Sequence, residues 1–164
     1  MVTVATDYEA MFRSQFPRLV SLGVAMTGRN DIAHDLAQET MLRAHRNWAT
    51  VSTYDAPQAW LRRVMANLLI DHHRSVRSER AAVDRLSVRD DMVDAAPALD
   101  DWWRIVSPLP ARQRMIVTLY YADDLSVGEI ADTLGISNGA VKASLFKARR
   151  SIERRLRDEE HHDG

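Results

Sequence analysis

The stretch from Leu125 to Arg150, LSVGEIADTLGISNGAVKASLFKARR, constrains the fold more than any other part of this 164-residue chain. Ser126 followed three residues later by Glu129 is a capping box, so a helix should begin there. The apolar residues that follow are spaced to lie along one side of that helix. Gly135 can adopt the left-handed conformation that ends a helix, and Ser137 can cap the next one. The pattern predicts two helices joined by a tight turn.

The second of these helices is expected to be apolar on one side and basic on the other. Between Asn138 and Arg157 there are seven lysine or arginine residues and one acid, Glu153. Two helices, a glycine-containing turn and a basic outer face are typical of a helix-turn-helix whose second helix enters the DNA major groove. The alternative, an αα-hairpin with a merely solvated basic face, is disfavoured by this concentration of one charge sign. The residues expected to be buried are Val141, Leu145, Ala148, Ile152 and Leu156, and those expected to face outward are Asn138, Lys142, Lys147, Arg149 and Arg150.

Composition limits the remaining classes of protein. A hydrophobic content of 46% is enough for a core, and the length allows one ordinary domain or two small ones. No apolar run approaches the length of a membrane span, and the N-terminus lacks the pattern of a signal peptide. The absence of cysteine excludes disulfides and thiolate metal sites, which fits the cytoplasm as the expected location.

Charge is segregated along the chain although the net charge is only −1. Acids are concentrated between Asp84 and Asp101 and again between Asp123 and Asp132, whereas bases dominate beyond Asn138. Such segregation suits a protein that contacts DNA with some faces and another protein with others.

The first half of the chain shows amphipathic helical patterns. A capping pattern at Thr6 and Glu9 opens the first predicted helix, and Pro17 predicts a kink or an early break within it. Asp31 is a suitable cap for a second helix from Ile32 to Trp48. Most of the polar residues of that second helix fall on its outer side, where Leu42 is expected to be exposed among them.

Further helices are expected downstream of a loop at residues 49–57. The third long helix runs from Gln58 to about Val76. Periodicity and apolar content then fall, which indicates a linker from Ser78 to Ala96. A short helix around Trp102 and a helix from Ala111 to Tyr121 precede the helix-turn-helix.

The chain is therefore expected to be all-α, with two small helical domains joined by a flexible linker and the helix-turn-helix in the C-terminal domain. The sequence contains no internal repeats. The expected boundaries are 1–80 for the first domain, 81–96 for the linker, 97–158 for the second domain and 159–164 for a disordered tail.

Three segments in register resemble the extracytoplasmic-function sigma factors of bacterial RNA polymerase. AHDLAQETMLRAHRNW (Ala33–Trp48) resembles the family's helix that docks on the polymerase clamp. AWLRRVMANLLIDHHR (Ala59–Arg74) resembles the helix that melts and reads the minus-ten promoter element. The segment from Leu109 to Ile152 resembles the domain that reads the minus-thirty-five element. The resemblance covers nearly the whole chain.

This resemblance implies roles for single residues. Asn67, Asp71 and Arg74 match positions that read the non-template strand, and residues 49–55 take the place of a base-capturing loop. The implied polymerase-binding residues are Asp35, Gln38, Glu39, Leu42 and Arg43. The implied major-groove residues are Gly139, Lys142, Ala143, Phe146 and Lys147, to which the basic face adds Asn138 and Arg149.

The physical requirements of DNA melting point to the same region. Unstacked bases must be held in pockets, and the displaced strand needs a basic channel. Arg62, Arg63 and Arg74 would supply the charge. Tyr54 would stack on a base, whereas Trp48 is better explained as part of the core.

We therefore expect a sigma factor that binds core RNA polymerase and directs promoter recognition, DNA melting and transcription initiation. It is expected to be non-catalytic and to need no metal or cofactor. The expected partners are promoter DNA and the clamp and flap regions of core polymerase, with one copy bound and no membrane contact. The family is commonly held by anti-sigma proteins, so the acidic segments are candidate surfaces for such an inhibitor.

Two alternatives remain at the level of sequence. An ordinary helix-turn-helix regulator shares the pattern GEIADTLGISNGAVKASL, but it would leave Ala33–Arg74 without a function. The string Asp71-His72-His73 also occurs in a family of metal-dependent phosphoesterases. Consecutive helical side chains point about 100° apart, however, so these three cannot converge on one metal ion.

Overall fold

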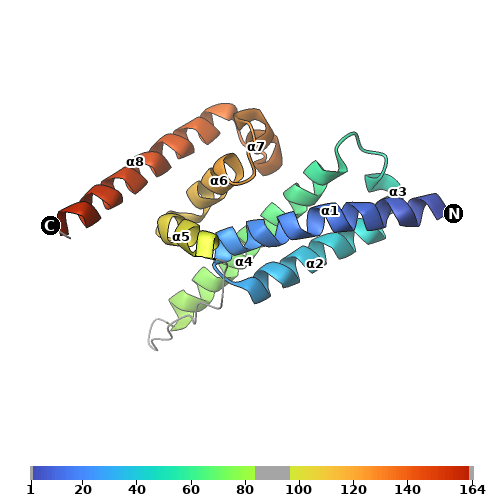
Figure 1. The fold of residues 1–164 in the computed structure, drawn as a ribbon, viewed down its shortest axis with the longest axis horizontal. Helices are drawn as coiled ribbons and strands as arrows, with labels where there is room; N and C mark the ends of the chain where they lie inside the picture. Colours follow the sequence, from blue (N-terminus) through green and yellow to red (C-terminus); the bar gives the residue numbers. More distant parts are fainter. Residues whose placement is uncertain (1, 84–96, 163–164) are drawn as a thin grey trace.

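Every regular element in the described part of the chain is an α-helix (Figure 1). The structure is a computed structural model that describes residues 2–83 and 97–162. The expected all-α class is confirmed. The helices are α1 (Val2–Thr27), α2 (Asn30–Arg46), α3 (Trp48–Val51), α4 (Pro57–Val83), α5 (Pro97–Val106), α6 (Ala111–Tyr121), α7 (Val127–Leu134) and α8 (Asn138–His162).

Helices α1, α2 and α4 pack against one another and form the N-terminal half of the molecule (Figure 1). Their shared core contains Ala37, Met41 and Met65, each at most 1% exposed. Tyr8 of α1 donates a hydrogen bond to the carbonyl oxygen of Met41 in α2 (2.9 Å). The ring of Tyr8 also meets the buried Trp48 edge to face, with 5.4 Å between ring centroids. Trp48 is therefore a core residue, as expected.

The first two helices begin earlier than predicted. Helix α1 starts at Val2, so Thr6 lies inside it; a capping pattern marks one possible start, and backbone hydrogen bonds can extend a helix beyond it. The helix also continues through Pro17 without ending. Helix α2 follows Arg29, which has an extended backbone and makes no side-chain cap. Asp31 lies in its first turn instead and pairs with Arg29 (2.8 Å).

Two further boundaries differ from the prediction. The expected loop at 49–57 begins with the short helix α3, because Trp48 and Val51 are both buried and one helical turn brings them to the same side. Helix α4 extends to Val83 rather than ending near Val76, since residues 77–83 (RSERAAV) are rich in good helix formers. Residues 81–83 of the predicted linker are thus helical, and residues 84–96 lie outside the described residues.

Helices α5 to α8 form the C-terminal half. Helix α6 has the predicted bounds, and its apolar residues Met115, Ile116 and Leu119 are fully buried. Leu156, which was expected to be buried, is 47% exposed, because it lies at the edge of an open groove between α8 and α5. Helix α8 continues to His162, so residues 159–162 of the predicted disordered tail are helical.

The two halves pack against each other, which the prediction of separately tethered domains did not include. Gly28, just after α1, has a backbone φ of 69°, and a Cβ atom there would lie 2.6 Å from Cε2 of Trp103 in α5. Only glycine fits, since both the left-handed backbone and the contact with the indole exclude a side chain. This close contact joins the end of α1 to α5.

A buried arginine completes this junction. Arg114 of α6 is 8% exposed, and its guanidinium lies over the Trp103 ring, 5.1 Å from the centroid. Its terminal nitrogens donate to the carbonyl oxygens of Met26 (2.9 Å), Ser107 (2.9 Å) and Leu109 (3.1 Å). Burial lowers the pKa of Arg114 from its usual value. One side chain therefore links the end of α1 to the turn between α5 and α6.

Candidate nucleic-acid and polymerase interfaces

The helix-turn-helix of α7 and α8 is built from local hydrogen bonds at the start of each helix. Oγ of Ser126 accepts from the backbone N–H of Glu129 (3.1 Å), and the Glu129 carboxylate accepts from the N–H of Ser126 (2.8 Å). These bonds lower the pKa of Glu129. Gly135 ends α7 with φ 65°, and Oγ of Ser137 accepts from the N–H of Ala140 (3.1 Å). The predicted capping box, left-handed glycine and second cap are all confirmed.

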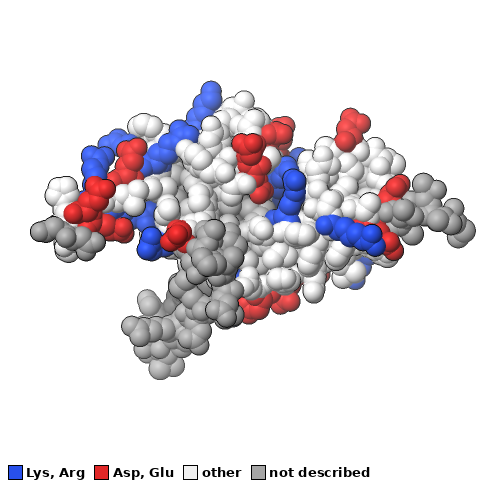
Figure 2. Space-filling view, viewed as in Figure 1, with Lys and Arg blue, Asp and Glu red and all other residues white. Residues whose placement is uncertain are grey.

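Helix α8 is held in place by its apolar side and presents its basic side to solvent. Val141, Leu145 and Ala148 are buried against α6 and α7. In Figure 2, Lys and Arg side chains follow the upper edge of α8, with acids toward its C-terminal end. We call the exposed predicted site residues the α8 face: Asn138, Gly139, Lys142, Ala143, Phe146, Lys147 and Arg149.

Arg149 and Arg150 each contact an aromatic side chain on or beside the α8 face. Phe146 is 60% exposed, and the guanidinium of Arg150 lies 5.6 Å from its ring centroid. Arg149 donates from Nε to the hydroxyl of Tyr121 at the end of α6 (2.7 Å). This hydrogen bond raises the pKa of Arg149. Tyr121 is not among the predicted site residues, because no local pattern indicates that the end of α6 lies beside Arg149.

The predicted minus-ten residues lie on α4 and in the segment just before it, and they differ in exposure. Arg63, Asn67, Asp71 and Arg74 are exposed and spaced four, four and three residues apart, so they form one stripe along α4, called here the α4 stripe. Tyr54, 44% exposed, comes from the segment before α4. Arg62 is half-buried to one side of the stripe.

The C-terminal half covers part of this region. Arg63 donates a hydrogen bond to the carbonyl oxygen of Asp132 in α7 (3.1 Å). Asp123, in the turn between α6 and α7, is half-buried; burial raises its pKa, while the charges of Arg62 and Arg18 oppose that shift. Asp123 and these two arginines line a polar cleft of about 410 Å³ between the halves. No pattern in the sequence predicts this cleft.

The predicted polymerase-binding residues lie together on α2. Their spacing places them on one side of the helix. Leu42 is 43% exposed, and Arg43 donates from Nε to the Glu39 carboxylate (2.8 Å). The result is a polar strip containing an exposed apolar side chain, called here the α2 face: Asp35, Gln38, Glu39, Leu42 and Arg43.

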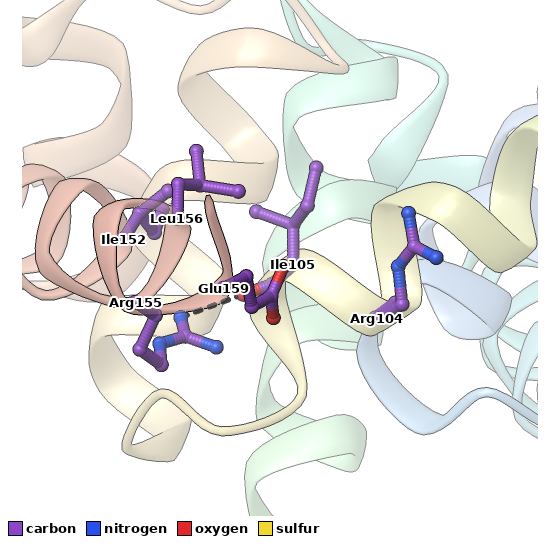
Figure 3. A pocket seen from close by; sticks show the side chains of 6 residues that line it. All are labelled: Arg104, Ile105, Ile152, Arg155, Leu156 and Glu159. Carbon is purple, nitrogen blue, oxygen red and sulfur yellow. Dashed lines mark hydrogen bonds between the residues drawn. The ribbon is translucent and has the colours of Figure 1, made fainter. Parts of the chain in front are cut away.

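The C-terminal part of α8 is attached to α5 through a shallow groove. Figure 3 shows Arg155 donating to the carbonyl oxygen of Ile105, a distance of 2.8 Å. Ile152 and Leu156 line the same groove from α8, and Arg104 lines it from α5. The contact holds α8 at a point well beyond the α8 face.

The described residues offer neither a cluster of metal ligands nor a membrane-spanning helix. They contain no group of three or more histidine, cysteine, aspartate or glutamate side chains able to hold a metal ion. Asp71, His72 and His73 are consecutive residues within α4. None of the described helices is long and apolar enough to span a bilayer.

Comparison with known proteins identifies the family. Residues 11–79 match the family model of sigma-70 region 2, and residues 99–152 match that of sigma-70 region 4. The chain is 34% identical over 135 residues to the ECF RNA polymerase sigma factor SigF of Caulobacter vibrioides, covering 80% of this chain and 75% of that protein. It is 29% identical over 157 residues to the ECF sigma factor SigW of Bacillus subtilis, covering 86% and 84%.

A solved structure shares the fold. The sigma factor RpoE of Bartonella quintana, crystallised with the anti-sigma factor NepR, superimposes with a TM-score of 0.74 over 92% of this chain and 97% of that one, at 20% identity. The resemblance drawn from the sequence is confirmed by the family models and relatives. The chain belongs to the ECF RNA polymerase sigma factors and directs promoter recognition and transcription initiation by RNA polymerase.

Proposed function

We propose that the two halves of this sigma factor divide the promoter between them. The N-terminal half (1–80) would bind core polymerase and would read and melt the minus-ten element, and the C-terminal half (97–158) would read the minus-thirty-five element. The observation that carries this proposal is the α8 face, a basic exposed surface on the second helix of a locally capped helix-turn-helix. That geometry suits insertion of the N-terminal part of α8 into a major groove.

Within the α8 face, charged and apolar residues would have different tasks. Lys142 and Lys147 would contact guanine or phosphate as point charges. Ala143 and Phe146 would contact the methyl group of thymine. Asn138 and Gly139, at the beginning of α8, would approach the base edges or backbone most closely.

The α4 stripe and Tyr54 would act on the separated strand. The exposed tyrosine ring would stack on a base that has left the duplex. Asn67 and Asp71 would hydrogen-bond base edges, while Arg62, Arg63 and Arg74 would hold the strand's phosphates.

This assignment requires the two halves to part. The minus-ten and minus-thirty-five elements are roughly 25 base pairs apart, about 85 Å at 3.4 Å per pair. In the structure Arg63 instead contacts Asp132 of the other half. Arg63 would have to leave Asp132 before it met DNA.

The α2 face would bind the polymerase clamp, with Leu42 as its apolar contact. The C-terminal half would lie at the flap. We propose a non-catalytic subunit without a cofactor, present in one copy per polymerase and acting in the cytoplasm. An anti-sigma protein is a further proposed partner, supported by the solved complex of RpoE with NepR.

Transcription from a library of randomised promoters with purified core polymerase tests this proposal. Two conserved elements should emerge among the transcribed templates. Lys142→Ala should change only the upstream one, and Asn67→Ala only the downstream one. Tight binding of the free chain to an intact duplex site, with no transcription when core polymerase is added, would contradict the division of labour.

A further inference from the structure

Tyr121 holds Arg149 in one orientation at the edge of the α8 face. Nε of Arg149 donates to the tyrosine hydroxyl (2.7 Å), and the guanidinium carbon lies 5.6 Å from the Tyr121 ring centroid and 5.5 Å from that of Tyr120. The two tyrosine rings meet edge to face. An exposed arginine normally samples many rotamers, and ordering it costs entropy. Here the hydrogen bond to Tyr121 orders Arg149 in advance, so a ligand does not have to bear this entropic cost.

The pair still has hydrogen-bond donors available. A phenolic hydroxyl has one hydrogen and two lone pairs, and the bond from Arg149 uses only a lone pair. The hydroxyl hydrogen therefore remains as a donor, together with the terminal N–H groups of the guanidinium that do not face the hydroxyl of Tyr120. Tyr121 is 52% exposed and Arg149 is also exposed, so these donors open onto solvent. They are arranged to meet an acceptor with several oxygens.

The local charge favours an anion. Arg149 is a cation whose pKa is raised by the bond to Tyr121. The nearest acid along α8, Glu153, is paired with Arg157 at 3.7 Å. Arg150 adds a second positive charge beside it. The pair therefore presents net positive charge.

The position of the pair fits the sugar-phosphate backbone better than the bases. Arg149 lies seven residues after Lys142, or about 10 Å along the helix on the same side. It borders the buried side of α8, where α6 ends. When the N-terminal part of a recognition helix enters the groove, residues at this edge face the groove wall, which is formed by phosphates.

We infer that Tyr121 and Arg149 together bind one DNA phosphate beside the minus-thirty-five element, with two terminal N–H groups of Arg149 and the hydroxyl of Tyr121 as donors. Tyr121 thereby joins the DNA-contacting residues, and it also positions Arg149. The inference rests on the proposed role of the α8 face. A phosphate contact sets the position and register of the helix but does not select a sequence.

The test uses Tyr121→Phe, which keeps the ring and removes the hydroxyl. Tyr120→Phe is the comparison variant: the Tyr120 ring also lies over Arg149, and its hydroxyl contributes less than that of Tyr121 to the raised pKa of Arg149. Binding of core polymerase carrying each variant is measured on promoters obtained from the library, over a series of salt concentrations. Tyr121→Phe should weaken binding roughly fivefold, by the same factor on every upstream sequence, and Tyr120→Phe less than about twofold.

A double variant tests the coupling. Arg149→Ala should make the dependence of log affinity on log salt shallower by about 0.9, which corresponds to one lost phosphate contact. In that background Tyr121→Phe should have little further effect. Equal effects of the two tyrosine variants, or a Tyr121→Phe penalty that depends on base sequence, would overturn the inference. Circular dichroism checks that each variant folds. If Tyr121→Phe does not fold, Arg149→Ala still tests the phosphate contact on its own.

Failure of this inference is distinguishable from failure of the proposed function. If Lys142→Ala alters upstream sequence preference while Tyr121→Phe and Arg149→Ala change nothing, the phosphate pair is wrong and the α8 face stands. If Lys142→Ala and Lys147→Ala also change nothing, the α8 face does not contact DNA, and both proposals are wrong.

Discussion

Gly28 and Gly135 adopt nearly the same left-handed backbone, with φ of 69° and 65°, yet their surroundings differ completely. A Cβ atom at Gly28 would meet the indole of Trp103 from the other half of the molecule, whereas at Gly135 it would meet nothing within 4 Å. The turn at Gly135 is specified by its neighbours in sequence, including the cap at Ser137, while Ser126 caps the other end of the helix that Gly135 ends. The turn at Gly28 also depends on α5 and α6. The same residue in the same conformation can therefore serve a local or a long-range purpose.

The largest change in the free energy of unfolding is expected at Arg114, which stabilises the turn at Gly28 through contacts between distant segments. Arg114→Leu would keep the apolar contact with Trp103 but leave the carbonyl oxygens of Met26, Ser107 and Leu109 without their donors. We expect a loss of about 3 kcal/mol in the free energy of unfolding, measured in urea. The control is Arg112→Leu on the exposed side of the same helix, expected to cost below about 0.5 kcal/mol. Equal losses would show that the buried guanidinium does not stabilise the junction.

Replacing both glycines by alanine tests the comparison directly. Each variant bears the cost of a left-handed alanine, about 1 kcal/mol. Gly28→Ala should lose about 1–2 kcal/mol more, because its methyl group collides with Trp103. Thermal or urea unfolding of the two variants gives the difference. If the losses were the same, the contact between Gly28 and Trp103 would have no energetic importance.

The locally specified helix-turn-helix should respond to the cap of its first helix, α7. Ser126→Ala removes the acceptor for the N–H of Glu129 and should cost about 1 kcal/mol of unfolding free energy, whereas Ser126→Gly should cost only a few tenths. Hydrogen exchange of the α7 amides should accelerate in the alanine variant while the amides of α1 are unaffected. Acceleration spread evenly over both halves would show that the turn is not an independent local unit.

The smallest effects concern the dependence of stability on pH. The local cap at Glu129 and the carboxyl of Asp123 between the halves should change the free energy of unfolding in opposite directions. The pKa of Glu129 is lowered by its bonds to Ser126, so its contribution is present above the unfolded pKa and is lost as pH falls through the folded one. The pKa of Asp123 is raised by burial, so its contribution is present at low pH and is lost as pH rises through the folded pKa.

Unfolding measured between pH 3 and pH 7 checks both signs. On acidification, wild type should lose stability relative to Glu129→Gln, which keeps a capping side chain without the titrating charge. Over the same range wild type should gain stability relative to Asp123→Asn. Parallel pH profiles for all three proteins would mean that neither carboxyl is perturbed in solution.

The sequence was sufficient for the helix-turn-helix and for α6, where the determining contacts lie within a few residues. The caps at Ser126 and Ser137, the glycine at 135 and the bounds of α6 were predicted correctly, because each depends on bonds or patterns local to the chain. The exposed side of α8 was predicted for the same reason, since helical periodicity fixes which residues share a side. The roles of those residues in DNA and polymerase binding stay predictions.

Contacts between distant segments were not predictable in this way. An arginine in an amphipathic helix is ordinarily exposed, and nothing near Arg114 indicates the three carbonyl groups that it satisfies. Tyr121 was missed because its partner Arg149 is 28 residues away. The end of α4 lies at Val83 and not near Val76, because no capping signal between these residues stops the helix.

Helix α8 is a single rod of 25 residues, gripped near both ends. Arg155 is attached to α5 at Ile105, and Lys142 lies about 20 Å away along the same axis. A stiff rod transmits displacement with little loss. A ligand that displaced the C-terminal part of α8 from α5 would therefore tilt the whole helix. Lys142 and Lys147 would then change their alignment with the DNA major groove, although the ligand made no contact with DNA.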